Sequence, residues 1–334
     1  MKTQAKNQKK AHADKNLIEK QFDRIFDSHL TTTLKYGFCI FISQALISCG
    51  PNNLNSNSHS SPFVTVAGDL ASDGDAANNN GIVNGTPVSV LDTIAQSTVS
   101  IMNDEQILCT GTLISTSIVI TAAHCNLSNP SNNYYVGFSI EVPNGSNEVQ
   151  KRKVLKQIIH PRFAALTPKE MANENLKDLN DVSLVLFEGA APANYQPVWL
   201  LQDPRYLFKG QQLTVAGYGL TKGFPKIEYA NSLMKANFTI ASTDYARTEF
   251  VIFDNSGKAT CRGDSGGSAY LNYKGRMILA AVTSRSLTAK TANTCNGGSV
   301  HSSIPGNLAF INFAVKQLNE FKATYTENIF SLLQ

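Results

Sequence analysis

Short apolar segments separated by turn-forming residues recur along this 334-residue chain, and no long helical period links them. Many of their residues are β-branched or aromatic, which is typical of strands in half-buried sheets. The clearest segments are Ser97–Met102, Ile107–Leu113, Ile118–Thr121, Tyr134–Val142, Val182–Phe187, Leu213–Tyr218, Ala236–Ile240, Ala269–Leu271 and Met277–Ser284. The pattern predicts an all-β fold, either a sandwich or a barrel. With 42% apolar and 16% charged residues, the chain is too hydrophobic for general disorder.

Helical signals are few. Thr167 and Glu170 form a capping box with Pro168 at the first helical position, which predicts a short helix that continues toward Leu176. Near the end of the chain, apolar residues recur at helical spacing and predict an amphipathic C-terminal helix. These residues are Ile311, Val315, Leu318 and Phe321.

An apolar run at Tyr36–Ile47 is too short to span a bilayer and suits the hydrophobic region of a signal peptide. It ends in Leu46-Ile47-Ser48-Cys49, which resembles the lipobox of bacterial lipoproteins, where the cysteine is lipidated and becomes the new N-terminus. A plain secretory signal with an incidental cysteine is the alternative. We therefore expect export, with membrane attachment only through a lipid at Cys49, either on the bacterial envelope or followed by release through cleavage.

Residues 1–33 are long for the start of a signal peptide and contain four acidic residues, so we hypothesise that translation begins at Leu34. An unprocessed precursor that began at Met1 would contradict this. Residues 50–81 are rich in Asn, Ser, Asp and Ala and contain no Lys or Arg. This composition is typical of a flexible linker. The expected organisation is an N-terminal extension and signal peptide at 1–49, a linker or propeptide at 50–81, and a folded domain at 82–334.

The net charge of +4 does not indicate a nucleic-acid partner. Residues 1–35 hold eight Lys or Arg against four Asp or Glu, whereas the remaining residues hold 21 of each sign. Binding to nucleic acid therefore has no electrostatic support in the expected folded domain. We expect a monomer.

Four cysteines remain outside the signal region: Cys109, Cys125, Cys261 and Cys295. In an exported chain they predict two disulfides, for which three pairings are possible. We favour Cys109–Cys125 and Cys261–Cys295. Each would close a modest loop, worth about 3 kcal/mol in the chain-entropy model. The spacings fit neither a zinc ribbon nor a CxxC redox motif, and we expect no metal.

A candidate nucleophile lies in Gly263-Asp264-Ser265-Gly266-Gly267. Glycines around a serine allow a tight turn in which backbone N–H groups approach a reacting carbonyl and stabilise an oxyanion. An ordinary surface turn is the alternative for this segment taken alone.

Two further polar residues stand at the ends of apolar strands. His124 follows Ile118–Thr121, and Asp181 precedes Val182–Phe187, where burial of its charge is costly unless a donor meets it. The alternatives are a core histidine and an aspartate that caps a turn.

Together these motifs resemble the chymotrypsin-like (trypsin-like) serine protease family. The segments that carry the resemblance are Ile82–Gly85, Thr121–Cys125, Asn180–Val185 and Gly263–Gly267, with weaker support from Ile159–Pro161 and Val215–Gly219. The resemblance runs from Ile82 to about residue 321, and the order His, Asp, Ser is that of the family. It implies two six-stranded antiparallel β-barrels followed by a C-terminal α-helix.

The resemblance also implies roles for individual residues. Ser265 would attack the scissile carbonyl, His124 would carry the proton, and Asp181 would hold the imidazole and stabilise its charged form. The N–H groups of Gly263 and Ser265 would form the oxyanion hole. Substrates would be proteins or peptides, and no cofactor would be needed.

Activation is a further implication. Asp264 has no evident local partner, and in the family a newly cut N-terminus, here Ile82, pairs with this aspartate. Gly81 precedes the cut where many relatives carry Arg or Lys, so the activating protease is not expected to be trypsin-like. We expect the full-length chain to be inactive until it is cleaved before Ile82.

The resemblance places six residues around the primary substrate pocket: Ala259, Thr260, Ser284, Arg285, Ser286 and Ser299. Trypsin-like members carry Asp at the position of Ala259, so a preference for Lys or Arg is not expected. Ser286 and Ser299 would narrow the pocket in favour of small or medium apolar side chains.

Three cations support a competing preference for acidic side chains: Arg262, Arg285 and His301. Solvated surface charge is their ordinary explanation. Two other functions also remain open, a catalytically silent homologue that acts as a binding module and a structural lipoprotein of the envelope.

Overall fold

The computed structural model describes residues 82–332, apart from 105, 130–131, 143–148, 172–175, 223–227, 288–294 and 296–297. Internal contacts divide the chain into two units, Met1–Asp75 and Ala76–Gln334, and all the described residues belong to the second. The expected signal peptide, the lipidation site at Cys49 and the linker lie outside the described residues.

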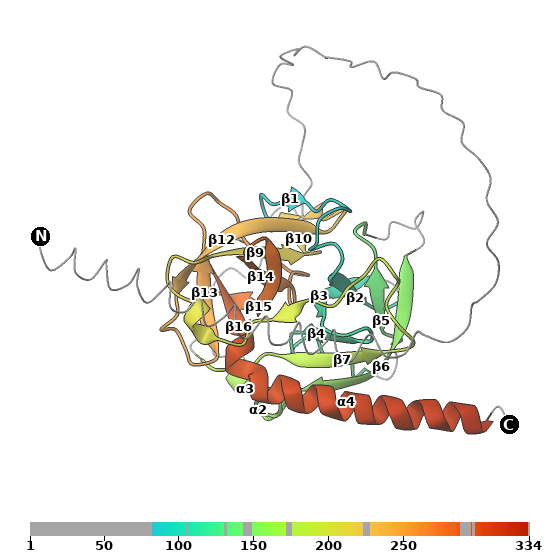
Figure 1. Ribbon diagram of the computed structural model, residues 1–334. Helices are drawn as coiled ribbons and strands as arrows, with labels where there is room; N and C mark the ends of the chain where they lie inside the picture. Colours follow the sequence, from blue (N-terminus) through green and yellow to red (C-terminus); the bar gives the residue numbers. More distant parts are fainter. Residues whose placement is uncertain are drawn as a thin grey trace, which may run out of the picture. The chain divides into compact units, whose positions relative to one another are not determined.

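Six antiparallel strands close the first barrel (Figure 1). In spatial order they are β2 (Thr98–Met102), β3 (Ile107–Leu113), β4 (Ile118–Thr121), β7 (Ser183–Phe187), β6 (Gln150–Ile159) and β5 (Tyr135–Phe138). Strands β2, β4 and β7 are buried along their whole length, which explains their nearly continuous apolar or β-branched sequences.

Six more antiparallel strands close the second barrel, because β9 pairs with both β14 and β12. In order they are β9 (Gln212–Gly217), β12 (Met234–Ser242), β13 (Glu249–Phe253), β16 (Ser299–Ser303), β15 (Arg276–Ser286) and β14 (Ser268–Tyr273). Short strands extend this framework: β1 (Thr86–Pro87) pairs with β12, and β8 (Trp199–Leu200) runs parallel to β15. A separate hairpin joins β10 (Leu220–Lys222) to β11 (Glu228–Tyr229). The predicted all-β double barrel is confirmed.

The described helices are α2 (Pro161–Ala164), α3 (Pro168–Met171), α4 (Ile304–Leu332) and a 3₁₀ turn at Pro204–Tyr206. The predicted capping box is present, since the backbone N–H and the hydroxyl of Thr167 both donate to the Glu170 carboxylate. Helix α3 ends at Met171, and Leu176 is not helical.

Helix α4 is the predicted C-terminal helix and packs on β7, β15 and β16 (Figure 1). Ile311 and Leu318 are fully buried, and Val315 and Phe321 pack partly buried against the same core. No helix within the described residues is long and apolar enough to cross a membrane.

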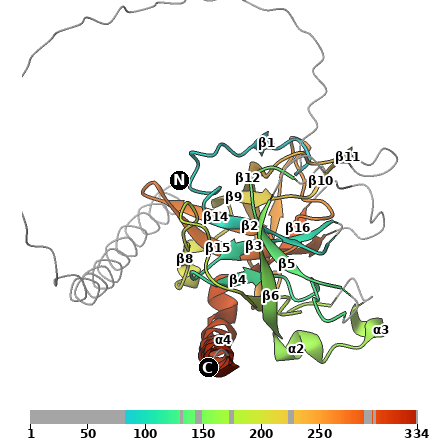
Figure 2. The same cartoon turned by 90° about the vertical axis from the view of Figure 1, so that its right-hand side faces the viewer.

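The two barrels meet through buried hydroxyl groups, with β3 of the first barrel beside β14 of the second (Figure 2). The Tyr270 hydroxyl is hydrogen-bonded to Ser97 Oγ and Thr98 Oγ1, both at 2.8 Å. The hydroxyls of Thr112 and Ser268 are hydrogen-bonded at 2.5 Å. Each bond joins the first barrel to the second and satisfies polar atoms that would be costly to bury alone.

Candidate active site

Strand pairing brings His124 and Asp181 together. Thr121 and Ser183 are register partners in the antiparallel pair β4–β7. His124 follows Thr121 by three residues and Asp181 precedes Ser183 by two, so both lie just beyond the same end of this pair. Two segments far apart in sequence therefore meet at one edge of the first barrel.

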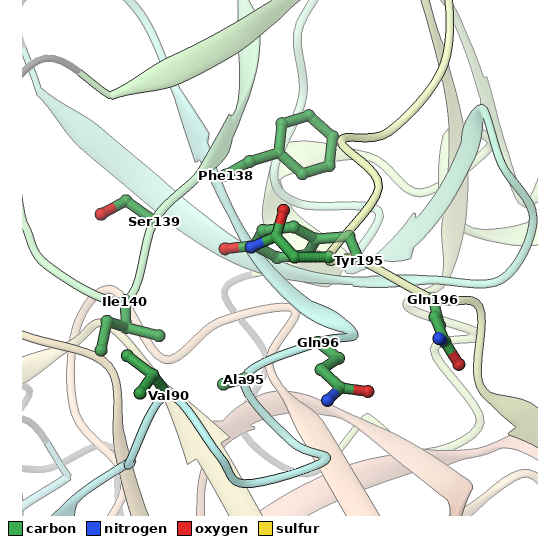
Figure 3. Close-up of a pocket in the computed structure, with 9 residues that line it drawn as sticks. Val90, Ala95, Gln96, Phe138, Ser139, Ile140, Tyr195 and Gln196 are labelled. Carbon is green, nitrogen blue, oxygen red and sulfur yellow. The ribbon is translucent and has the colours of Figure 1, made fainter. Parts of the chain in front are cut away.

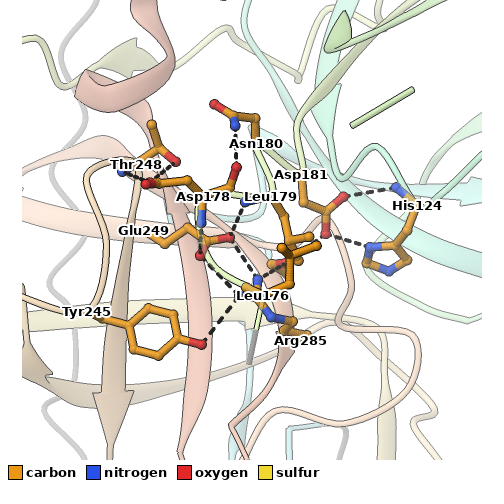
Figure 4. Close-up of polar contacts among 11 residues, drawn as sticks. His124, Leu176, Asp178, Leu179, Asn180, Asp181, Tyr245, Thr248, Glu249 and Arg285 are labelled. Atoms are coloured by element: carbon orange, nitrogen blue, oxygen red, sulfur yellow. Dashed lines mark hydrogen bonds and ion pairs between the residues drawn. The ribbon is translucent and has the colours of Figure 1, made fainter. Parts of the chain in front are cut away.

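The carboxylate of Asp181 accepts three hydrogen bonds (Figure 4). Its Oδ1 accepts from the backbone N–H of His124 at 2.9 Å, and its Oδ2 lies 2.7 Å from His124 Nδ1. Ser284 Oγ donates to the same Oδ2 at 2.7 Å. Asp181 is 2% exposed, so these donors replace the water that burial removes.

Each of the two titratable groups shifts the pKa of the other toward its charged form. Desolvation lowers the pKa of His124, but the charge and hydrogen bond of Asp181 outweigh it, so that pKa is raised above its ordinary value. Desolvation raises the pKa of Asp181, but the charge and hydrogen bonds of His124 and the Ser284 hydroxyl outweigh it and lower that pKa. The His124 side chain remains 37% exposed, so the ring is open to solvent beyond the aspartate.

The Ser265 loop is held against the same strand end. Thr110 N–H donates to the Ser265 carbonyl at 2.9 Å, and Cys125 Sγ lies 3.8 Å from that oxygen. Gly266 has φ 78°, and a Cβ there would lie 2.0 Å from Thr121 Oγ1, so only glycine fits. In the described part of the chain the His124 ring is hydrogen-bonded to Asp181 and not to Ser265. Hydrogen bonds of this kind often tighten only when substrate binds.

The backbone N–H groups of this loop fall into two sets. Those of Asp264, Gly266 and Gly267 donate to Cys261, Thr283 and Asp264 carbonyls at 2.8 to 3.1 Å. Those of Gly263 and Ser265 have no acceptor among the described residues. Thr110 Oγ1 donates to the Gly263 carbonyl at 2.8 Å and fixes that peptide. The two uncommitted donors are the ones that the sequence assigned to an oxyanion hole.

Asp264 is fully buried with two donors and no cation among the described residues. Its Oδ1 accepts from Gly219 N–H at 2.9 Å and its Oδ2 from Cys261 N–H at 2.8 Å. Burial outweighs these hydrogen bonds and raises the pKa of Asp264 to about 7. A Cβ at Gly217 would lie 2.2 Å from this carboxylate, so the glycine leaves room for it.

The segment that begins at Ile82 lies inside the domain. Ile82 is completely buried, and Val83 N–H donates to the Ala259 carbonyl at 2.9 Å. Ala259 stands two residues before Cys261, whose N–H binds Asp264. The backbone at Ile82 and the buried carboxylate are thus attached to the same short segment.

Of the six predicted pocket residues, Ser286 and Ser299 lie next to each other, whereas Ser284 and Arg285 have partners outside the predicted pocket. Ser286 and Ser299 are direct register partners in β15–β16, Ala259 is buried and Thr260 is half-buried. Ser284 is turned to Asp181, so it supports the candidate triad.

Two of the three cations proposed to bind an acidic side chain are unsuited to that role. Arg285 places its guanidinium on both carboxylate oxygens of Glu249, which neutralises it (Figure 4). His301 is fully buried, and burial lowers its pKa to about 3, so it is neutral at neutral pH. Its Nε2 is hydrogen-bonded to Ser299 Oγ at 3.0 Å. Arg262 is exposed and is left as the one candidate for this role among those three.

The disulfides are Cys109–Cys125 and Cys261–Cys295, the pairs that the sequence favoured. The first lies beside His124, whose ring approaches both sulfurs. Because the sulfurs are joined to each other, they are not thiolates and this group does not form a metal site.

A cavity of about 260 Å³ lies elsewhere on the domain (Figure 3). It is lined by Val90, Ala95, Gln96, Phe138, Ser139, Ile140, Asn194, Tyr195 and Gln196. None of these residues belongs to the candidate triad or its loop.

Sequence reasoning missed several residues that build the site. Glu249, Tyr245, Asp178 and Thr110 carried no local signal, because each acts through a partner that is distant in sequence. Only the fold brings those partners into contact.

Comparison with known proteins places these features in a family. The family model described as Trypsin matches residues 82–303. The urokinase-type plasminogen activator of Gallus gallus is 30% identical over 205 residues, which cover 55% of this chain and 46% of that protein. Snake venom serine protease 5 of Trimeresurus stejnegeri is 28% identical over 57% of this chain and 72% of its own length.

Solved structures show the same fold. Mouse neuropsin, a serine protease, superposes with a TM-score of 0.56 at 21% identity, covering 70% of this chain and all of its own. The human heparin binding protein has the same TM-score at 18% identity. The chain spans about half the length of the chicken protein. Because a single family model matches the whole double barrel, which holds all three candidate catalytic residues, the chain belongs to the trypsin family.

Proposed function

We propose that this protein is a serine endopeptidase in which Ser265, His124 and Asp181 form the catalytic triad. The observation that carries the proposal is the buried Asp181 carboxylate, bonded to both the backbone and the ring of a solvent-open His124 beside the Ser265 loop. A serine hydroxyl is a weak nucleophile at neutral pH unless a base is placed next to it. The arrangement supplies that base.

The reaction begins when Ser265 Oγ attacks the scissile carbonyl carbon and His124 Nε2 accepts its proton. Asp181 keeps the remaining proton on Nδ1 and stabilises the imidazolium. The carbonyl oxygen becomes an oxyanion that receives hydrogen bonds from the N–H groups of Gly263 and Ser265. His124 then protonates the leaving amine, which leaves an acyl-enzyme, and the same residues activate water to hydrolyse it.

Covalent labelling tests this proposal. After cleavage before Ile82, a fluorophosphonate probe should modify Ser265, and Ser265→Ala should abolish the label. His124→Ala should slow labelling strongly, because the base is lost. A correctly folded, cleaved chain that neither reacts nor cleaves a peptide library would instead support a binding role, such as the heparin binding indicated by the name of one structural neighbour.

We also propose that the chain is made as a zymogen. Cleavage after Gly81 would create an ammonium group at Ile82, and the buried Asp264 carboxylate is the acceptor that lacks a cation among the described residues. A buried carboxylate is strongly stabilised by an opposite charge. The activator would cut in a stretch that has no Lys or Arg, so it would not be trypsin-like. High activity of a chain with an intact 50–81 segment would contradict this.

The primary pocket is proposed to accept small or medium apolar side chains, because Ala259 stands where trypsin-like members carry Asp and the paired residues Ser286 and Ser299 would narrow the wall. Cleavage-site profiling of a peptide library tests this preference. Export with a lipid at Cys49 is proposed from the signal-like segment. Palmitate incorporation that is lost in Cys49→Ala would support the anchor, and equal labelling of both proteins would refute it.

A further inference from the structure

A buried ion pair lies immediately behind the candidate triad (Figure 4). Arg285 NH1 donates to Glu249 Oε1 at 2.8 Å, and NH2 donates to Oε2 at 3.0 Å. The Glu249 side chain is completely buried, and Arg285 is 24% exposed. This two-point geometry fixes the orientation of the guanidinium as well as its position.

The same guanidinium reaches the residue that supports Asp181. Arg285 NH1 lies 3.2 Å from Ser284 Oγ, and Ser284 Oγ lies 2.7 Å from Asp181 Oδ2. A guanidinium has donors and no acceptor, so the Ser284 oxygen must accept from Arg285. The single hydroxyl proton of Ser284 is then available only for Asp181. Arg285 therefore holds the Ser284 hydroxyl oxygen from its acceptor side, while the hydroxyl proton is donated to the triad carboxylate.

Glu249 holds the segment that delivers Asp181. It accepts from the backbone N–H groups of Asp178 at 3.0 Å and Leu179 at 3.2 Å. Arg285 NH2 also donates to the Leu176 carbonyl at 3.1 Å. Residues 176–179 are thus attached to the ion pair through three backbone groups.

This segment needs such support because its backbone is strained. Asp178 and Asn180 both have φ 54°, a left-handed conformation that residues with a side chain adopt at a cost. Asp178 Oδ1 accepts from Thr248 N–H at 2.8 Å and from its hydroxyl at 2.9 Å, which adds a further restraint from the residue before Glu249.

We infer that Arg285 is a positioning residue: paired with Glu249, it orients the Ser284 hydroxyl toward Asp181 and fixes the 176–180 segment that carries Asp181 into the site. This inference rests on the proposed function of the triad. It also gives the Arg285–Glu249 pair a role in catalysis, in place of binding an acidic substrate.

The positive charge adds a second effect that can be measured. Asp181 raises the pKa of His124, whereas the charge of Arg285 lowers it, and these are the two charged groups that act on the ring. Loss of the charge at residue 285 should therefore raise the His124 pKa. Displacement of Asp181 alone would instead lower the His124 pKa, because the charge and hydrogen bond of Asp181 raise it, so the direction of the shift separates the two effects.

The test uses a double variant, Arg285→Met/Glu249→Gln, because removing one partner alone leaves a buried charge and risks unfolding. The glutamine keeps one oxygen for one of the two backbone N–H groups at 178 and 179, and methionine fills the space of the arginine stem. Thermal unfolding should stay close to that of the unmodified protein. In the cleaved chain, kcat/KM for a peptide substrate should fall at least tenfold, mainly through kcat, because a small misplacement of a catalytic group reduces the rate strongly.

Histidine titration by NMR provides a readout that does not need activity. In the full chain carrying Ser265→Ala, the double variant should move the His124 pKa upward, with His124→Gln used to identify the signal. Arg285→Lys keeps the charge but loses the fork, so it should lower kcat and leave the His124 pKa nearly unchanged. Arg205→Gln, which breaks an exposed pair with Asp203, serves as the matched control and should change neither quantity.

The outcomes separate the two proposals. An unmodified cleaved chain without activity would refute the proposed function, and the His124 titration would still test the effect of Arg285. A folded double variant with unchanged His124 pKa overturns the inference, and so does one that retains kcat/KM within twofold in an active protein.

Discussion

The carboxylate of Asp264 makes a quantitative prediction for the uncleaved chain. Burial raises its pKa from the ordinary value of 3.8 to about 7. In the uncleaved chain the nitrogen of Ile82 is a peptide nitrogen, so it brings no charge to offset this burial. We predict that Asp264→Asn stabilises the precursor at alkaline pH and inactivates the cleaved enzyme.

The sign of the effect follows from proton linkage. Between about pH 4 and 7 the folded precursor keeps a proton on Asp264 that the unfolded chain has already lost, so its free energy of unfolding falls as pH rises. Each unit corresponds to 1.36 kcal/mol, so the folded state loses about 4 kcal/mol by pH 7 and little more above it. Asparagine has nearly the shape of the protonated acid and no proton to lose, but its NH2 group cannot accept from a backbone N–H, so one of the two hydrogen bonds is lost at every pH. The effect of Asp264→Asn on the free energy of unfolding should therefore be about 4 kcal/mol more favourable at pH 8 than at pH 4.

Urea and thermal unfolding of the precursor at pH 4 and pH 8 measure this difference, with Ser265→Ala in both proteins to prevent self-cleavage. For a domain of this size that difference corresponds to about 10 °C in the shift of Tm caused by the substitution. The cleaved Asp264→Asn protein should lose activity, because the ammonium of Ile82 would find no carboxylate. Equal stabilities at both pH values, together with full activity after cleavage, would refute the reasoning.

Further predictions concern the groups around the triad. Ser284→Ala removes one of three donors to the buried Asp181 carboxylate, so kcat/KM should fall by about tenfold or more, which corresponds to the 1.5–3 kcal/mol of a hydrogen bond to a charged group; an unchanged kcat/KM would contradict that role. Gly266→Ala should prevent formation of the active loop and destabilise the domain by more than about 2 kcal/mol, because its Cβ would lie 2.0 Å from Thr121 Oγ1. Its matched control is Gly275→Ala, which has a similar φ of 83° and no atom within 4 Å of the added Cβ, and it should cost only about 1 kcal/mol in urea unfolding. The value of kcat/KM should decline as the pH falls below the raised pKa of His124. Asp181→Asn should move that decline to lower pH and reduce the rate by orders of magnitude. If the decline stays at the same pH in this variant, it does not report the titration of His124.

The parts of the fold and site that could be predicted from sequence are those encoded in short contiguous segments. Alternating or continuous apolar runs marked most strands, because burial on one or both sheet faces leaves a local pattern. The Thr167–Glu170 capping box was visible because both of its residues lie within one helical turn. Leu176, toward which that helix was expected to continue, is not helical, and its carbonyl accepts from the distant Arg285.

The contacts that hold the site together could not be predicted in the same way. Glu249 lies 36 residues from Arg285 and 71 from Asp178 in sequence, and neither separation carries a local signature. Arg285 was interpreted as a pocket residue and, with Arg262 and His301, as a cation for an acidic substrate or as solvated surface charge. Glu249 belongs to β13 and Arg285 to β15, and both strands pair with β16, so the two charges lie on the same part of the barrel wall.

Thr110 explains why neither barrel could carry the site alone. It belongs to β3 of the first barrel, yet its N–H and hydroxyl hold the carbonyls of Ser265 and Gly263 in the second. Its hydroxyl oxygen also accepts from Tyr218 N–H at 3.1 Å, so one side chain connects the nucleophile loop to the end of β9. The candidate base comes from the first barrel and the candidate nucleophile from the second. The geometry between them is therefore set by the interface between barrels, and a substitution such as Thr110→Val should reduce activity while each barrel keeps its own hydrogen-bonded strands.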